Sequence, residues 1–286
     1  MKYALIVVCA LMTTLSAAKA PLKKITCHLQ PLALTTYGPL RNPLYTSSKI
    51  KNLWSHPNIK KTDLKYGGSQ NWSGYVAAKS FSSPNKNSVE YITGTWQIPV
   101  LSPSNERTYS AIWVGIDGFN QRDTIQQIGT EHDWVEGMQV NYAWFEMYPD
   151  YAYTLIGFPV RTGDTIRARV KHVQNGRYSL KIVNVSRGVY VVVPYNNTIL
   201  KSAVRTCAEW IVEAPTRKTG ILPLANFNTV QIRDCRVRIN GVHSSINNPA
   251  WQQQEMWMMN TQNETKAFPS ALSDDGSAFS VTWVSK

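Results

Sequence analysis

Apolar and polar residues alternate in short runs along most of this chain, and clusters of Gly, Pro, Asn, Asp and Ser separate the runs. Alternation with a period of two places successive side chains on opposite faces and is typical of β-strands. The pattern predicts strands over residues 90–99, 108–116, 123–129, 138–148, 165–173, 178–185, 188–193, 208–213, 228–240 and 278–284. No stretch of useful length has the apolar spacing of an amphipathic helix. A succession of strands without helices predicts an all-β fold, a sandwich of two packed antiparallel sheets.

Two glutamates stand in the otherwise apolar stretch 207–215, which contains the strand predicted at residues 208–213. Alternation puts Ala208, Trp210 and Val212 on one face, which is wholly apolar. Glu209 and Glu213 lie on the other face. An unpaired buried carboxylate is costly, so this second face either meets water or lines a polar cavity. An outer face with two ordinary charges is the simpler interpretation of this segment alone.

A second strand combines aromatic residues with a carboxylate. In residues 141–149, Tyr142, Trp144, Glu146 and Tyr148 share one face, and the intervening residues are apolar. Such a face suits a ligand chain held by stacking and hydrogen bonds. Cross-strand aromatic packing on an exposed sheet face explains the pattern equally well.

The run TIQQIG, residues 124–129, places Gln127 on the same face as Ile125 and Gly129, and Gln126 on the opposite face. A carboxamide does not titrate, but it donates hydrogen bonds and can stabilise a developing oxyanion. A glutamine on its own is a weak indication of catalysis.

The start of the chain is typical of a secretory signal peptide, with one Lys, an apolar run from Tyr3 to Met12 and then small residues. We therefore expect residues 1–20 to be removed on export. Residues 21–68, rich in Pro and basic residues, are expected to form a leader or pro-segment, and residues 69–286 to form one domain. The apolar run is too short to span a membrane comfortably, so we expect a secreted protein, extracellular or periplasmic, without membrane insertion.

The net charge of +12 is distributed unevenly. Residues 21–68 hold eight Lys or Arg against Asp63 alone, whereas residues 69–286 hold 20 basic and 17 acidic residues. The excess therefore belongs mainly to the leader, and no nucleic-acid partner is predicted for the domain. We expect the domain to act as a monomer.

Several common hydrolase signatures are missing from the sequence: His-Glu-x-x-His, Gly-x-Ser-x-Gly, Asp-Thr-Gly and Asp-Ser-Gly. There is no Cys-x-x-Cys pair, and the spacing of Cys207 and Cys235 leaves open whether they form a disulfide. The cluster around His132 has metal-binding residue types, but adjacent strand residues point to opposite faces, which favours a solvated loop. We therefore predict no metal and no cofactor.

Seven motifs, taken together, resemble those of the glutamic peptidases, the eqolisin family, and span about residues 70–286. They are NWSGYV at 71–76, TGTWQIP at 93–99, WVGIDG at 113–118, TIQQIG at 124–129, YAWFEMYP at 142–149, AEWIVE at 208–213 and SAFSVTW at 277–283. The resemblance implies a lectin-like β-sandwich of two curved antiparallel sheets, with the active site in the concave face. The family's catalytic glutamine and glutamate correspond here to Gln127 and Glu213. The resemblance also implies substrate-binding positions in the cleft at Trp113, Asp117, Trp144, Glu146 and Tyr148. Strand alternation adds Tyr142 and Glu209 to this set, because Tyr142 shares a face with Trp144 and Glu209 shares a face with Glu213.

The implied activity is that of an endopeptidase acting on polypeptides with a directly activated water, as in the family's acid proteases. Gln126 and Ile128 replace the Leu and Thr that usually flank the catalytic glutamine, and Tyr142 stands where fungal relatives often have Asp. These departures affect the expected pH optimum and substrate preference but leave both dyad residues in place. The alternatives are a lectin-like carbohydrate-binding module that uses the same aromatic face, or a catalytically inactive homologue.

Overall fold

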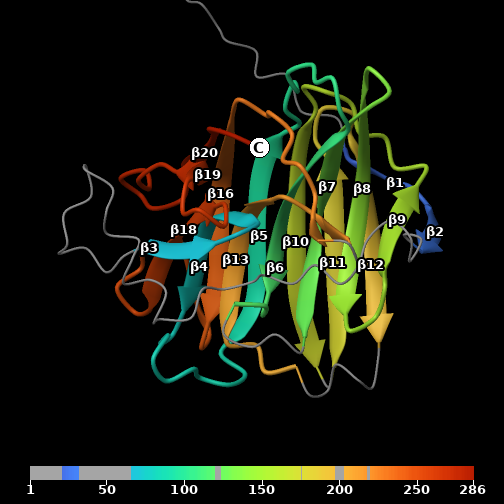
Figure 1. Ribbon diagram of the computed structural model, residues 1–286. Coiled ribbons are helices and arrows are strands. Elements are labelled where there is room, and N and C mark those ends of the chain that lie inside the picture. Colours follow the sequence, from blue (N-terminus) through green and yellow to red (C-terminus); the bar gives the residue numbers. More distant parts are fainter. Residues whose placement is uncertain (1–20, 32–65, 120–123, 175, 197–202, 218–219) are drawn as a thin grey trace, which may run out of the picture.

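The predicted all-β architecture is confirmed by a computed structural model that describes residues 21–31, 66–119, 124–174, 176–196, 203–217 and 220–286 (Figure 1). The described chain contains strands and no helix, and therefore no helix long and apolar enough to cross a membrane. Ten of its strands correspond to the ten predicted runs, although the run predicted to end at residue 129 continues to Val135.

The strands are β1 (Lys23–Lys24), β2 (His28–Pro31), β3 (Tyr66–Ser69), β4 (Trp72–Ala78), β5 (Val89–Gln97), β6 (Thr108–Ile116), β7 (Ile125–Val135), β8 (Met138–Tyr148), β9 (Ala152–Ile156), β10 (Thr165–Gln174), β11 (Arg177–Asn184), β12 (Val189–Asn196), β13 (Cys207–Glu213), β14 (Thr216–Arg217), β15 (Gly220–Ile221), β16 (Thr229–Ile239), β17 (Val242–Ser244), β18 (Gln252–Met259), β19 (Thr265–Pro269) and β20 (Phe279–Trp283). Eighteen of them form one sheet, and β14 pairs with β15 separately.

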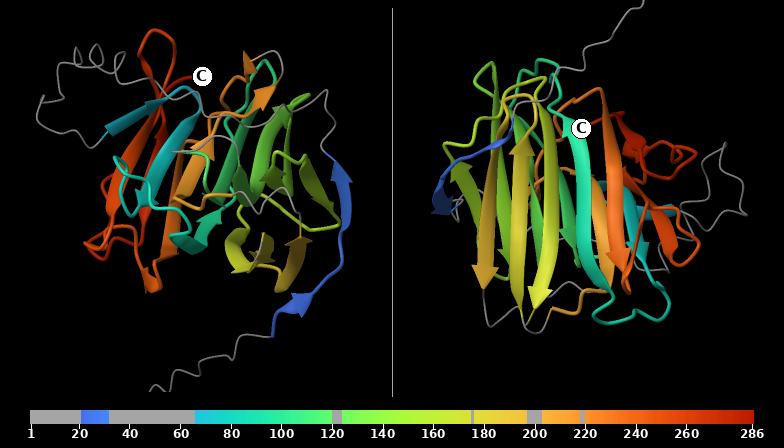
Figure 2. Two further views of the ribbon diagram at one scale, coloured as in Figure 1. Left: turned by 90° about the horizontal axis from the view of Figure 1, so that it is seen from below. Right: turned by 180° about the vertical axis from the view of Figure 1, so that it is seen from behind.

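Strand pairing follows one continuous path through the large sheet. It runs from β2 through β9, β8, β7, β6, β13, β4 and β18, and then through β19, β20, β16, β5, β10, β11 and β12 to β1. The path turns back on itself, so that β10 and β11 pack against β6 and β7 (Figure 2). Two pairs, β1–β12 and β18–β3, are parallel. Hydrogen bonding thus joins the layers into a single mixed sheet, where the sequence predicted two antiparallel sheets.

The main hydrophobic core lies between the two layers and is formed by the alternating apolar positions of their strands. Trp210 and Val212 of β13 and Phe145 of β8 belong to this core and are almost fully buried. The indole N–H of Trp210 donates a 2.8 Å hydrogen bond to the backbone oxygen of Thr93 on β5. The one polar group of this large buried side chain therefore has a hydrogen-bond partner. The predicted core faces of β8 and β13 are confirmed.

The described part of the predicted leader, residues 21–31, lies along the two ends of the strand path. Strand β1 pairs with β12 at one end, and β2 pairs with β9 at the other (Figure 1). Most of the leader, residues 32–65, and the predicted signal peptide lie outside the described residues. Strand β3 starts at Tyr66, three residues before the predicted start of the domain, and pairs with β18.

Cys27, Cys207 and Cys235 are all free thiols. Cys235 is buried in the main core, whereas Cys207 belongs to a second apolar cluster on the other face of its layer. The disulfide that the sequence left open is therefore not formed.

Candidate active site

The second face of the layer formed by β4, β13, β6, β7 and β8 brings together the residues that the sequence analysis singled out. Cross-strand register aligns Glu209 of β13 with Gly115 of β6, Gly115 with Gln127 of β7, and Gln127 with Glu146 of β8. Glu213 lies further along β13 on the same face. Each of these side chains points away from the main core, as their strand parity predicted.

Trp113 lies between the two predicted catalytic residues. A Cβ added at Gly115 would stand 2.8 Å from Cζ3 of Trp113 and 3.3 Å from Cβ of Gln127. A Cβ added at Gly129 would stand 2.3 Å from the backbone oxygen of Ile112 and 2.6 Å from Cβ of Trp113, so Gly129 allows the close approach of β6 to β7. Gly115 leaves the space that the indole occupies, beside Gln127 at one edge. At its other edge, the indole nitrogen reaches Glu213.

Glu213 is completely buried, and two donors hold its carboxyl group. Nε1 of Trp113 donates to Oε2 at 2.7 Å, and Nδ2 of Asn71 donates to Oε1 at 2.8 Å. Burial, together with repulsion from the neighbouring Glu146, raises the pKa of Glu213 to about 8, although the hydrogen bonds from Trp113 and Asn71 oppose the shift. A buried carboxyl with a raised pKa and fixed geometry is suited to accepting and returning a proton near its pKa.

Gln127 is also completely buried and is oriented by Glu146. Its Nε2 donates a 2.6 Å hydrogen bond to Oε2 of Glu146, while its Oε1 has no hydrogen-bond partner in the structure. Since a carboxamide nitrogen carries two hydrogens, one N–H of Gln127 stays available to a ligand. Burial raises the pKa of Glu146 to about 8, with a smaller contribution from Asp150, and the hydrogen bond from Gln127 opposes the shift.

Asp117 and Glu209 form a second buried acidic pair at the end of this face. Asp117 accepts backbone N–H hydrogen bonds from Arg205 at 2.7 Å and from Thr206 at 2.8 Å. Burial raises its pKa to about 6 despite these donors. Burial also raises the pKa of Glu209 well above its usual value, and repulsion from Asp117 adds to it. Asp117 therefore anchors the backbone that leads into β13, in addition to any contact with a ligand.

The aromatic row of β8 lines the same face. Trp144 is buried in its apolar cluster, and Tyr142 and Tyr148 pack against that cluster while remaining partly exposed. The indole N–H of Trp144 has no hydrogen-bond partner in the structure. This face of β8 thus offers both aromatic surface and an unused donor beside Gln127 and Glu146.

The solvated-loop interpretation of His132 is wrong. His132 lies within β7 and is fully buried, with its ring nitrogens 3.1 Å from Oγ1 of Thr130 and from Oδ1 of Asn141. Burial lowers its pKa to about 4, so the ring is neutral across most of the pH range. Among the described residues, no group of His, Cys, Asp and Glu has a metal-binding arrangement.

Asn71 and Trp72 belong to the site but were not identified as site residues from the sequence. Trp72 stands opposite Glu213 in the pairing of β4 with β13, and its ring meets that of Trp113 edge-on with centroids 4.9 Å apart. Asn71 immediately precedes β4 and supplies one of the two donors to Glu213. The NWSGYV motif contained both residues, but without a predicted strand there its alternation could not be assigned to a face.

Comparison with known proteins finds relatives over most of the described domain. The Peptidase A4 family matches residues 70–283. Aspergillopepsin-2 from Aspergillus niger is 28% identical over 204 residues, covering 65% of this chain and 72% of that protein, and scytalidopepsin B from Scytalidium lignicola is 28% identical over 183 residues, covering 62% and 66%.

Two solved structures are similar over most of their length. The crystal structure of scytalido-glutamic peptidase with a transition state analog inhibitor gives a TM-score of 0.63 at 25% identity, covering 75% of this chain and 98% of that one. Aspergilloglutamic peptidase from Aspergillus niger gives 0.56 at 25% identity, covering 62% and 99%. The chain belongs to the Peptidase A4 family, the eqolisin glutamic peptidases, which are hydrolases.

Proposed function

We propose that this protein is a secreted endopeptidase in which Glu213 and Gln127 hydrolyse peptide bonds through an activated water. One observation carries the proposal: a fully buried Glu213, fixed by Trp113 and Asn71, shares its sheet face with an equally buried Gln127 that keeps an N–H available. A base and an oxyanion donor on one rigid face are the two groups that this hydrolysis needs.

In the proposed reaction, ionised Glu213 takes one proton from a water as the water oxygen attacks the peptide carbonyl carbon. The carbonyl π electrons move to the oxygen, and the second N–H of Gln127 donates a hydrogen bond to that oxyanion. When the tetrahedral intermediate collapses, the C–N bond breaks and protonated Glu213 gives its proton to the leaving nitrogen. The products are a carboxylic acid and an amine, and no acyl-enzyme forms.

Glu146 is proposed to position Gln127. Its hydrogen bond to Nε2 defines which end of the carboxamide faces the substrate. Its charge also influences Glu213, because each carboxyl makes ionisation of the other less favourable. The pair is therefore expected to lose its protons in two steps, and the intermediate state holds one proton.

The polypeptide substrate is proposed to lie over the aromatic row of β8. Tyr142, Trp144 and Tyr148 offer apolar surface, and the unused N–H of Trp144 can donate to a substrate carbonyl. Asp117 and Glu209 are proposed to border the same cleft. We also propose that the two layers correspond to the curved sheets of the lectin-like sandwich that the resemblance implies.

Residues 1–20 are proposed to act as the export signal and residues 21–68 as a leader that precedes the peptidase domain at residues 69–286. The composition of these segments supports this division. The pairing of β1 with β12 and of β2 with β9 supports a leader whose first residues stay bound to the folded domain.

The test is digestion of a denatured protein from about pH 2 to about pH 8, a range that spans the unperturbed and raised pKa values of glutamate. The full chain and its Glu213→Gln variant are compared, each with and without EDTA. The wild type should cleave internal peptide bonds and be insensitive to EDTA, and the folded variant should be inactive. Saturable glycan binding by the aromatic face without any turnover would favour the carbohydrate-binding alternative.

A further inference from the structure

Basic side chains gather on the outward face of the second layer, away from the candidate active site. The strands of this layer alternate between buried apolar residues and outward polar ones, and β12, β11, β10, β5 and β16 lie side by side when the molecule is seen from behind (Figure 2, right). The outward cations of these strands include Arg167, Arg169 and Lys171 of β10, Lys181 of β11, and Arg233, Arg236 and Arg238 of β16. We call these seven residues the basic face.

Like charges stand in register across these strands. Arg169 lies directly opposite Lys181 on one side, and on the other side it faces Thr93, which in turn faces Arg236. Like charges directly opposite each other in a sheet are destabilising. This arrangement therefore costs stability unless an anion neutralises it.

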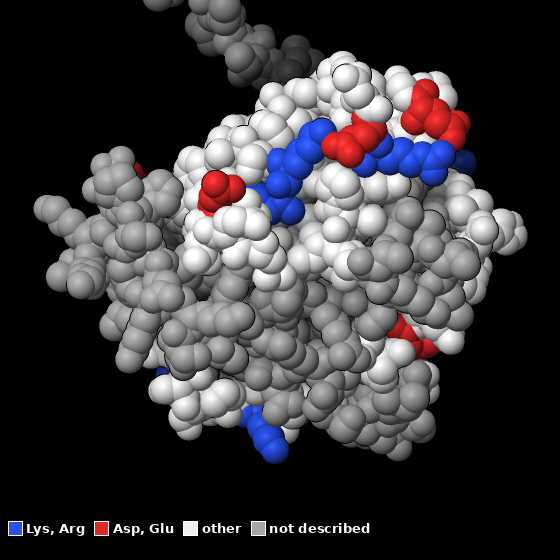
Figure 3. All heavy atoms as spheres, in the orientation of Figure 1, with Lys and Arg blue, Asp and Glu red and all other residues white. Residues whose placement is uncertain are grey.

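Carboxylates on the domain compensate this face only weakly. Asp234 lies 3.7 Å from Arg167, and Asp275 lies 3.9 Å from Arg236; all four side chains are at least one third exposed. Exposed ion pairs at such distances contribute little. On the face seen in Figure 3, by contrast, Lys and Arg lie beside Asp and Glu along the upper rim.

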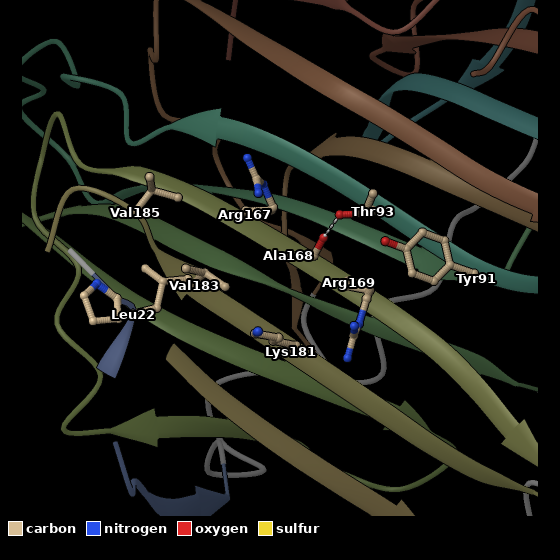
Figure 4. Close-up of a pocket in the computed structure, with 10 residues that line it drawn as sticks. Leu22, Tyr91, Thr93, Arg167, Ala168, Arg169, Lys181, Val183 and Val185 are labelled. Atoms are coloured by element: carbon tan, nitrogen blue, oxygen red, sulfur yellow. Dashed lines mark hydrogen bonds between the residues drawn. The ribbon is translucent and has the colours of Figure 1, made fainter. Parts of the chain in front are cut away.

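The basic face contains a groove of about 460 Å³ between Arg167, Arg169 and Lys181 (Figure 4). Nε of Arg169 is buried and has no hydrogen-bond partner, and Nζ of Lys181 lies 4.1 Å from the centre of the Tyr190 ring. Burial lowers the pKa of Lys181, and repulsion from Arg169 and Arg167 lowers it further. These contacts show that the cations repel one another and retain unused hydrogen-bonding capacity.

The charges of the basic face are spread over a larger area than one small anion can cover. Successive outward residues of a strand are about 6.6 Å apart, and β10 and β16, with β5 between them, are separated by about 10 Å. Strand β5 lies between the two rows. It carries one charge, the partly exposed Glu90 near its start, followed by the partly exposed Tyr91 and by Thr93 and Thr95, which are buried. A linear ligand with regularly repeated negative charges can contact both rows at once.

We propose that the basic face binds a linear acidic polysaccharide, with its carboxylate or sulfate groups on Arg167, Arg169 and Lys181 and a sugar ring against the partly exposed Tyr91. Charge complementarity identifies a polyanion. Single-stranded nucleic acid needs several exposed aromatic rings for its bases, whereas the described outward residues of β5, β10, β11, β12 and β16 offer two, Tyr91 and Tyr190, and Lys181 covers the Tyr190 ring.

The test measures binding of fluorescent polygalacturonate and of dextran sulfate to the full chain by anisotropy, with neutral dextran as the uncharged comparison. The triple variant Arg167→Gln/Arg169→Gln/Lys181→Gln should bind both polyanions at least tenfold more weakly, with an unchanged or higher Tm because a repulsive cluster is removed. Binding by the wild type should weaken steeply between about 0.05 M and about 0.3 M salt. Cleavage of a short peptide should be unaffected, since these side chains lie on the other layer.

A matched control removes three cations elsewhere, Lys79→Gln/Arg107→Gln/Lys286→Gln, so that net charge falls equally. This control should keep wild-type affinity. Equal weakening by both triple variants would mean that total charge alone drives binding and would overturn the proposal, as would undiminished binding by the first variant. Tighter binding of oligo-dT or polyglutamate than of polygalacturonate would overturn the assignment to a polysaccharide.

Discussion

The indole N–H of Trp113 donates a 2.7 Å hydrogen bond to Oε2 of Glu213, so an aromatic side chain of β6 fixes the carboxyl group of β13. Gly115 makes this contact possible, because the indole occupies the space where its side chain would stand. Both members of the pair are fully buried. The contact therefore controls the proton affinity of Glu213 as well as its position.

Trp113→Phe should shift the pH dependence of peptide hydrolysis toward higher pH. The lost N–H favours the ionised form of Glu213, so its removal raises the pKa of this carboxyl group further. The pH profile of kcat/KM measures the shift. Trp144→Phe is the matched control, since the Trp144 N–H has no carboxylate partner and its loss should leave the profile in place. Equal shifts in both variants would contradict this role of Trp113.

Glu146→Gln should have the opposite effect on the profile. Glu146 raises the pKa of Glu213 by repulsion, so replacing it with a neutral side chain lowers that pKa and moves the ascending limb of kcat/KM to lower pH. The new carboxamide oxygen can still accept the hydrogen bond from Gln127. A limb that stays in place or moves upward would show that Glu146 and Glu213 do not interact as described.

Gly115→Ala should reduce both kcat and stability. The added methyl group would stand 2.8 Å from Cζ3 of Trp113 and 3.3 Å from Cβ of Gln127, and the displaced indole would weaken the hydrogen bond to Glu213. Overpacking among such buried side chains typically costs about 1–3 kcal/mol of stability. Steady-state kinetics and a thermal melt measure the two effects. A variant with wild-type kcat would show that the position of Trp113 is unimportant for turnover.

The free energy of unfolding should fall as pH rises from about 6.5 to about 8. Glu213 and Glu146 have pKa values of about 8 in the folded protein and an ordinary value of 4.5, so the folded state binds more protons than the unfolded state across this range. Each such group contributes a slope of about 1.4 kcal/mol per pH unit while it stays protonated only in the folded state. The buried His132 acts with the opposite sign between its folded pKa of about 4 and its ordinary 6.5, below this window.

Urea denaturation at several pH values measures this slope, and Glu213→Gln should make it shallower. A stability that rises from pH 6.5 to pH 8 in the wild type would contradict the raised pKa values.

The sequence alone predicted which faces of β8 and β13 point into the core, because each strand has one wholly apolar face and burial of that face is favourable. Alternation alone therefore assigned Glu209, Glu213 and Glu146 to the correct face.

Strands without a clear apolar face were harder to predict. Strand β18 begins with three glutamines and has no alternation, and β4 contains a glycine and small residues.

Residues that depend on tertiary contacts were also missed. Asn71 reaches Glu213 only because β4 pairs with β13, a contact between segments far apart in the sequence. His132 sits in a charged sequence that is typical of a loop, yet Thr130 and Asn141 satisfy its ring nitrogens inside the protein. The continuity of the sheet through β18 and β19 depends likewise on long-range pairing that alternation cannot indicate.

The most direct test of the catalytic dyad is a double-mutant cycle on kcat/KM with one peptide substrate, using Glu213→Gln, Gln127→Ala and the combination. If Glu213 and Gln127 act as one unit on the same water, each single variant should lose at least about 10²-fold, and the double variant should be scarcely worse than Glu213→Gln alone. Matching thermal melts would show that all three remain folded. A folded Glu213→Gln variant with near wild-type kcat/KM, or losses that simply multiply in the double variant, would contradict the dyad.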